Sequence, residues 1–169
     1  MDDFGAQATA VIPRLRRYAR ALTGDYLAAD DLVQDTLERA LAKQHLWRQG
    51  SDLRAWMFTI MHNVFVNQVR SRAADLSTPM DAEALNVPAR ASPVDLLEVS
   101  DIDTAMQRLP IEQREVLLLV ALEQLSYVEA ARALGVPLGT VMSRLFRARE
   151  RLRVLLGGAP IASALKVVK

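Results

Sequence analysis

The sequence predicts an all-α protein of two small helical domains joined by a flexible acidic linker, with a helix-turn-helix in the C-terminal domain. Three observations predict it. Apolar residues recur at helical spacing through most of the 169 residues, and no segment alternates as a half-buried strand does. An acidic stretch with prolines and serines interrupts this period. Between 125 and 149 a short helix, a glycine turn and a basic helix follow one another.

The period predicts three helices in an N-terminal domain, at 5–22, 26–44 and 52–73, with Ser51 or Asp52 capping the third. The second of them has a buried stripe and an acidic outer face made of Asp31, Gln34, Asp35 and Glu38. The stripe consists of Leu32, Val33, Thr36, Leu37, Ala40 and Leu41. Four helices are expected in the C-terminal domain, at 98–108, 111–123, 127–134 and 138–156. The predicted divisions are therefore a domain at 1–72, a linker at 73–97, a domain at 98–156 and a tail at 157–169.

The helix-turn-helix has the clearest local signals. Ser126 and Glu129 form an S-x-x-E capping box at a helix start. Gly135 suits the left-handed conformation that ends this helix, and Pro137 fits the first turn of the next. One face is expected to be buried through Val128, Leu134, Val136, Val141 and Leu145. Thr140, Ser143, Arg144 and Arg147 then point outward, where hydroxyls suit phosphates and arginines suit base edges.

The distribution of charge supports a nucleic-acid partner. Residues 1–72 carry ten basic and eight acidic groups, 73–100 carry one and five, and 101–169 carry ten and seven. Five arginines between Arg144 and Arg153 are answered only by Glu150, so this helix is basic on balance. The 25 residues of the linker span at most about 80 to 90 Å when extended. Two major-groove faces one or two helical turns apart lie roughly 35 to 70 Å from each other, so one chain can hold both.

Composition excludes several classes. The longest apolar run is far shorter than a membrane span, and the acidic start lacks a signal pattern. The absence of cysteine excludes disulfides and thiolate metal sites and fits a reducing cytoplasm. His45 and His62 are too far apart in sequence for a local metal pair. We find no catalytic constellation, and we expect neither enzymatic turnover nor a metal, cofactor or small-molecule substrate.

The sequence resembles the extracytoplasmic-function (ECF, group IV) sigma factors of bacterial RNA polymerase over about residues 4 to 156. The matched segments are Asp31 to Asp35, Leu53 to Ile60 with Asn63, Leu109-Pro110 before Arg114 to Val116, and Leu125 to Arg149. The resemblance implies that the first domain melts and reads the minus-ten promoter element, and that the helix-turn-helix reads the minus-thirty-five element. It also implies binding to core polymerase, at the largest-subunit clamp helices and the flap, and control by an anti-sigma factor.

Specific residues follow from this resemblance. Asp31, Gln34 and Asp35 match the helix that docks on the polymerase clamp, and Trp47 and Arg48 match the loop that receives a flipped base of the minus-ten strand. The alternative for Trp47 is an anchor of that loop. Asn63 and Asn67, four residues apart on one helical face, could contact the same strand, with Arg70 and Arg72 on its phosphates. Thr140, Ser143, Arg144 and Arg147 match the reader of the upstream element. Met57, Met61, His62 and the segment Asn67 to Arg70 depart from the family pattern, so the resemblance supports the role better than any particular promoter sequence.

Two other functions stay open at this point. A stand-alone helix-turn-helix regulator would need neither the acidic helix nor the Trp47 loop. A sigma-like decoy for an anti-sigma factor would be expected to lose the DNA-reading arginines, which are present here.

Overall fold

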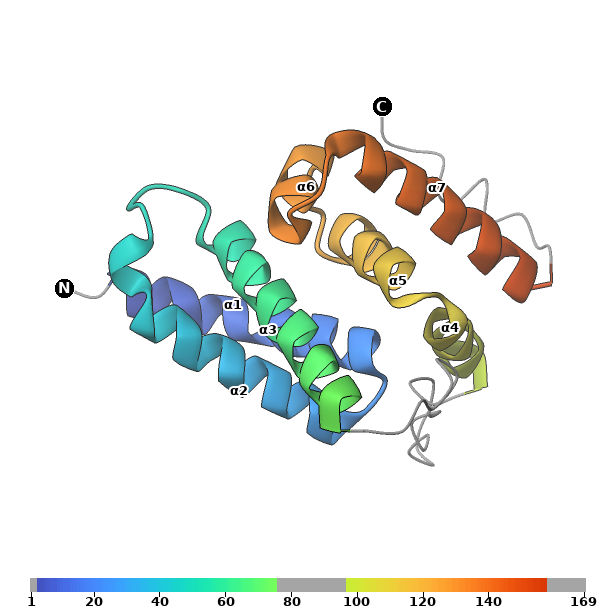
Figure 1. The fold of residues 1–169 in the computed structure, drawn as a ribbon, viewed down its shortest axis with the longest axis horizontal. Coiled ribbons are helices and arrows are strands. Elements are labelled where there is room, and N and C mark those ends of the chain that lie inside the picture. Colours follow the sequence, from blue (N-terminus) through green and yellow to red (C-terminus); the bar gives the residue numbers. More distant parts are fainter. Residues whose placement is uncertain (1–2, 76–96, 158–169) are drawn as a thin grey trace.

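The protein is described by a computed structural model that covers residues 3–75 and 97–157, and every regular element in these two ranges is helical (Figure 1). The first half contains α1 (Asp3–Thr23), α2 (Tyr26–Ala42), the short 3₁₀ turn η1 (Gln44–Leu46) and α3 (Leu53–Asp75). The second contains α4 (Leu97–Arg108), α5 (Ile111–Leu117), the π-helical segment η3 (Leu118–Leu122), α6 (Tyr127–Leu134) and α7 (Leu138–Leu155). The all-α prediction is confirmed. Most of the predicted linker and tail lies outside the described residues.

The two halves pack against each other rather than standing apart. Helices α1 and α3 both face the second half: α3 packs on α6, and α1 contacts α4, α5 and η3, while α7 lies on the far side of α5 and α6 (Figure 1). Buried apolar side chains form one continuous cluster that includes Leu15 and Met57 from the first half and Val116 and Val141 from the second. None of the described helices is long and apolar enough to cross a membrane.

Local capping sets where the N-terminal helices begin. The Asp25 carboxylate accepts a hydrogen bond from the amide of Leu27 at the start of α2 (3.3 Å). Asp52 does the same for α3, accepting from the amides of Arg54 and Ala55 (3.0 and 3.4 Å). Of the two predicted caps for this helix, Asp52 is therefore the one whose carboxylate accepts the first free amides.

Three details of the predicted elements are corrected by the structure. The helix expected at 26–44 ends at Ala42 and continues as a 3₁₀ turn. The helix expected at 111–123 changes to π geometry after Leu117, and the amide of Glu123 donates to the carbonyl of Leu118, five residues back (3.0 Å). Pro137 lies one position before α7 as its N-cap, with an extended backbone, and not within its first turn.

Two residues expected in the core are exposed. Val128 on α6 is 50% exposed and Leu41 at the end of α2 is 57% exposed. Leu41 lies at the margin of the α2 stripe, whereas Val128 lies on the side of α6 opposite to the buried Ala130, Ala133 and Leu134, because each residue turns a helix by about 100°. Leu32, Val33, Thr36 and Ala40 of the α2 stripe are buried as predicted, as are Leu134, Val141 and Leu145 of the helix-turn-helix.

Candidate DNA and polymerase interfaces

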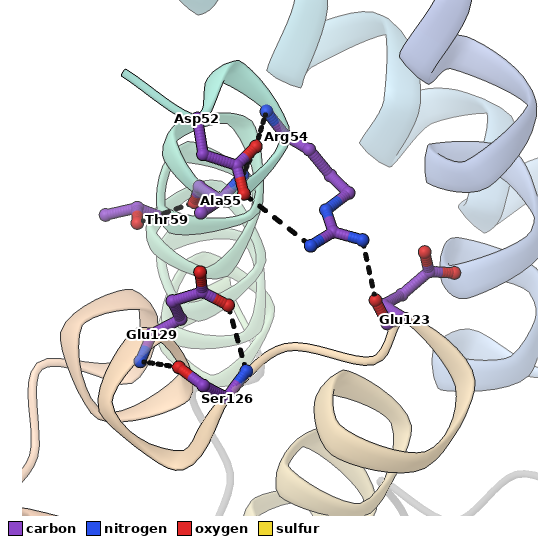
Figure 2. A network of polar contacts seen from close by, with 7 residues as sticks. All are labelled: Asp52, Arg54, Ala55, Thr59, Glu123, Ser126 and Glu129. Carbon is purple, nitrogen blue, oxygen red and sulfur yellow. Dashed lines mark hydrogen bonds and ion pairs between the residues drawn. The ribbon is translucent and has the colours of Figure 1, made fainter.

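The helix-turn-helix has the geometry that its sequence predicts. The Ser126 hydroxyl accepts from the amide of Glu129 (3.1 Å), and the Glu129 carboxylate accepts from the amide of Ser126 (2.9 Å; Figure 2). Gly135 ends α6 with φ 64° and ψ 36°, the left-handed conformation that glycine adopts without steric cost. Together these residues fix the angle at which α7 leaves the turn.

Helix α7 presents its polar residues away from the core. Its buried face consists of Val141, Leu145, Ala148 and Leu152. Ser143 and Arg147 are exposed, and Thr140 and Arg144 are half-buried on the opposite side. The Ser143 hydroxyl donates to the carbonyl of Thr140 (3.1 Å). The four predicted upstream-element residues thus lie within the first ten residues of one helix, the part that enters the major groove in helix-turn-helix complexes.

The predicted minus-ten residues fall into two groups. Trp47 and Arg48 belong to the loop between η1 and α3, whose Gly50 has φ 88°. Asn63 and Asn67 are exposed on α3, and so are Arg70 and Arg72 near its end. About 15 Å of helix separates the start of α3 from Asn63. These residues therefore form an extended surface along α3 rather than a compact pocket.

Trp47 is itself an anchor of its loop. Its ring lies 5.7 Å from the ring of Phe4 on α1, at 57°, and the side chain is partly buried. Its indole Nε1 is buried and has no hydrogen-bond partner among the described residues. Arg48 next to it is exposed. The role of Trp47 as an anchor of its loop therefore has direct structural support, while the exposed Arg48 stays available for contact.

The acidic face of α2 is only partly free. Asp31 and Gln34 are exposed, and the Gln34 amide lies 3.4 Å from the Glu38 carboxylate. Asp35 is half-buried and accepts a hydrogen bond from Gln68 on α3 (2.7 Å). Asp35 is thus oriented by its neighbouring helix, whereas Asp31 and Gln34 face outward.

A set of charged residues between the two halves was not predicted from the sequence. Arg17, Arg54 and His62 from the first half contact polar groups of the second, and Arg114, Glu115 and Glu123 are buried. The sequence did contain a signal for this set. Arg114, Glu115 and Glu123 flank or interrupt a largely apolar segment, 111–123. Charged residues in such a segment are buried only when they are paired, so their position indicates buried charge pairs.

Burial also shifts the pKa of two groups at this boundary. The pKa of the buried Tyr18 phenol is raised well above its usual range, chiefly by desolvation and then by the carboxylates of Glu115 and Glu123. Desolvation lowers the pKa of Arg114, and the Glu115 carboxylate opposes that shift.

A helix-turn-helix with a basic outer face is typical of DNA-binding proteins, and here it is attached to a second helical unit that carries an acidic helix. Residues 9–62 match the family described as "Sigma2 domain of PhyR", and residues 100–152 match "Sigma-70, region 4". The "ECF RNA polymerase sigma factor EcfG" of Rhodopseudomonas palustris is 40% identical over 155 residues, which cover 92% of this chain and 86% of that protein.

Solved structures agree with this. The sigma factor RpoE of Bartonella quintana, in complex with the anti-sigma factor NepR, has a TM-score of 0.78 and 36% identity, covering 92% of this chain and 98% of that one. CnrH in complex with the cytosolic domain of CnrY has a TM-score of 0.67 and 28% identity, covering 92% and 88%. The chain belongs to the ECF RNA polymerase sigma factors and acts in transcription initiation.

Proposed function

We propose that this protein binds core RNA polymerase and directs it to promoters by holding two DNA elements, as a group IV sigma factor without enzymatic turnover of its own. The observation that carries the proposal is the outer face of α7. There Thr140, Ser143, Arg144 and Arg147 share the solvent side of a helix whose entry is fixed by the capping box and Gly135. Hydroxyls suit phosphate oxygens, and a bidentate arginine reads guanine.

The first half supplies the second contact and strand opening. The minus-ten strand is received by Trp47, Arg48, Asn63 and Asn67. Its phosphates are held by Arg70 and Arg72. Support comes from the exposure of the asparagines and arginines along one helix. A base from the opened strand stacking on this surface contributes roughly 1 to 3 kcal/mol. Because Trp47 packs on Phe4, its indole ring is held in place before DNA binds. The loop therefore binds the base with a preformed shape.

The polymerase contact lies on α2. Asp31 and Gln34 face outward and Asp35 is oriented by Gln68, so the helix presents an acidic surface suited to an arginine-rich partner such as the clamp helices. The helix-turn-helix half binds the flap. The protein works in the cytoplasm, where the polymerase is found.

An anti-sigma factor is the expected regulator. The RpoE structure that is 36% identical to this chain is described as a complex with such a protein, the anti-sigma factor NepR. Binding of a purified anti-sigma protein that abolishes transcription by the holoenzyme tests this part of the proposal.

One alternative has an observation in its favour. The family that matches residues 9–62 is described from PhyR, and a PhyR structure is described as an anti-anti-sigma factor. Its 18% identity shows only a shared fold. A decoy of that type would bind an anti-sigma protein without starting transcription.

The deciding experiment is multi-round transcription with purified core polymerase on a library of fork-junction and duplex promoters. We expect transcripts from a defined subset of sequences, and only when this protein is added. If the protein yields no specific transcript but binds a duplex site tightly alone, the sigma role fails in favour of a repressor. If it yields no transcript and binds only an anti-sigma protein, the decoy is correct.

A further inference from the structure

The loop between α2 and α3 is held in place by a single side chain. In the segment 43–52 every residue except Trp47 is exposed, whereas Trp47 is partly buried and packs on the hydrophobic core. The amides of Leu46, Trp47 and Ser51 each donate to the carbonyl three residues back (2.8, 3.1 and 3.0 Å). Such local bonds shape the turns of the loop. The Trp47 ring is what places the loop relative to the helices.

Ring packing, and not hydrogen bonding, fixes the position of Trp47. Its ring centre lies 5.7 Å from that of Phe4 on α1, at an interplanar angle of 57°. Aromatic rings attract one another at this separation and tilt. The indole Nε1 is buried and has no hydrogen-bond partner among the described residues. The indole therefore depends on its apolar contacts, and the Phe4 ring is one of them.

Phe4 also contacts the helix that follows the loop. Its ring centre lies 6.1 Å from that of Trp56, in an edge-to-face arrangement at 79°. Trp56 belongs to the first turn of α3, and Trp47 directly follows η1. One ring on α1 thus touches both sides of the loop, and the start of α1 lies beside η1 (Figure 1).

The first turn of α1 is built to present this ring. The Asp3 carboxylate accepts a hydrogen bond from the Gln7 side chain one turn later (2.7 Å), and an acidic residue at a helix start is stabilising. Phe4 is only 8% exposed, and Ala8, one turn further on the same face, is buried as well. The ring is therefore held at the end of the helix, where the backbone alone would fray.

The proposed minus-ten surface needs such a support because it has two parts. Arg48 lies in the loop, and Asn63 and Asn67 lie on α3. One DNA strand contacts both parts only when the loop and the helix keep a fixed spacing. A loop that is ordered before binding also avoids the entropic cost of being ordered by the DNA.

We propose that Phe4 is a positioning residue for the minus-ten element: through Trp47 and Trp56 it holds the base-receiving loop at a fixed place beside α3. This inference rests on the proposed sigma function. Phe4 lies before residues 9–62, the part of the chain that matches the sigma2 family, so that match assigns it no role. Phe4 itself touches no DNA, and its effect on base preference passes through the two tryptophans.

Binding of holoenzyme to single-stranded DNA tests the role of Phe4. The probes are dye-labelled oligonucleotides with the minus-ten sequence of a promoter that this protein transcribes, and versions with each base replaced in turn. We expect Phe4→Ala to lower the strongest base preference by at least about fivefold, the smallest effect of losing one stacked base. Phe4→Tyr, which keeps the ring, should restore the preference. Binding to the duplex upstream element should not change.

A buried residue at the other end of α1 provides the control for general destabilisation. Leu22 is fully buried and lies roughly 27 Å from Phe4 along the helix axis. Leu22→Val should lower the thermal midpoint and leave the base preference unchanged. Phe4→Leu, which keeps an apolar side chain without the ring, disturbs α1 less than alanine and should still lose part of the preference. If Leu22→Val reduces the preference as much as Phe4→Ala does, the positioning role is wrong.

Tryptophan fluorescence of the free protein gives a second readout. Trp47 and Trp56 are the two tryptophans of the sequence, and both contact Phe4. In a Trp56→Phe background the emission reports on Trp47 alone. We expect Phe4→Ala to shift this emission to longer wavelength and to increase its quenching by acrylamide, whereas Leu22→Val should change neither. Unchanged emission in Phe4→Ala would show that Phe4 does not hold the indole.

Failure of this proposal is distinguishable from failure of the sigma function. If the unmodified holoenzyme prefers particular bases and the Phe4→Ala holoenzyme prefers them equally, the positioning role is wrong and the sigma function stands. If the unmodified protein gives neither transcripts nor binding to a minus-ten strand, the sigma function fails, and the role of Phe4 fails with it.

Discussion

The His62 imidazole on α3 lies 2.7 Å, from Nδ1 to Oε1, from the Glu115 carboxylate on α5. The two residues are 53 positions apart, and both side chains are largely enclosed by the two packed halves. In a buried setting a carboxylate needs a partner, because an unmatched charge keeps its full desolvation cost. His62, one of the positions where the sequence departs from the family pattern, thus has a structural partner within the protein.

We therefore expect His62→Ala to destabilise the protein by about 1 to 3 kcal/mol, the cost of leaving a buried acceptor unsatisfied. His62→Gln, whose amide can still donate, should recover part of that loss. The free energy of unfolding in urea, followed by circular dichroism, measures both. An unchanged midpoint for His62→Ala would mean that the contact contributes nothing.

The two glycines of the helix-turn-helix should respond to alanine with opposite signs. A Cβ at Gly135 or at Gly139 meets open space, so packing does not distinguish them. Gly135 has φ 64°, a conformation that costs an L-residue about 1 to 2 kcal/mol. Gly139 lies within α7, where alanine restricts the unfolded chain and stabilises by about 0.4 to 1 kcal/mol. Unfolding free energies of the two variants check this, and a shared sign would contradict it.

Tyr18 should make stability fall at alkaline pH. Its pKa is raised in the folded protein by burial and by two carboxylates, so the folded state keeps the phenol proton more tightly than the unfolded chain. Below about pH 10 both states are protonated and Tyr18 adds no pH dependence. Above it the unfolded chain loses the proton first, and stability decreases by up to about 1.4 kcal/mol per pH unit.

Tyr18→Phe isolates this contribution. Above about pH 10, the unfolding free energy of the variant should decline less steeply than that of the unmodified protein. Below about pH 10, the two proteins should show the same pH dependence of the unfolding free energy. Absorbance of the tyrosinate gives a second readout, as the difference between the two titrations. Identical slopes for the two proteins would show that Tyr18 ionises as freely when folded as when unfolded.

The helix-turn-helix could be predicted because its signals are local. Ser126, Glu129 and Gly135 act on amides and dihedral angles within a few residues, and each takes the expected geometry. The first residues of α2, α6 and α7 were predictable for the same reason, whereas the end of α2 at Ala42 was not. The π segment was not, because the apolar run before Glu123 has the same composition in either geometry.

The contacts between the halves could not be predicted because their partners are distant in sequence. Arg17 and Glu123 are 106 positions apart, and Arg114 and Leu22 are 92 apart. No period relates such residues, and an arginine on an amphipathic helix normally indicates a solvated face. The predicted DNA and polymerase residues are a different case. Their exposure agrees with the proposed contacts for Arg48, Asn63 and Asp31, whereas Trp47 and Asp35 are engaged inside the protein.

Arg144 and Arg151 provide a matched pair for promoter specificity. They are seven residues apart, so they share a face of α7 and differ by about 10 Å along its axis. Only the first turns of a recognition helix reach base edges. We expect Arg144→Ala to cost roughly 1 to 3 kcal/mol on the preferred upstream element and little on others, which relaxes specificity.

Arg151→Ala should instead weaken binding to all upstream sequences alike and reduce the salt dependence by about one ion, because a lost phosphate contact releases one counterion fewer. The measurement is binding of the holoenzyme to promoters that differ only upstream, at several salt concentrations. Arg144 is half-buried near the start of α7, whereas Arg151 is exposed near its end. We therefore expect the loss of specificity from Arg144→Ala and the general loss of affinity from Arg151→Ala. Equal losses on every upstream sequence for both variants would show that α7 grips the DNA backbone without reading it.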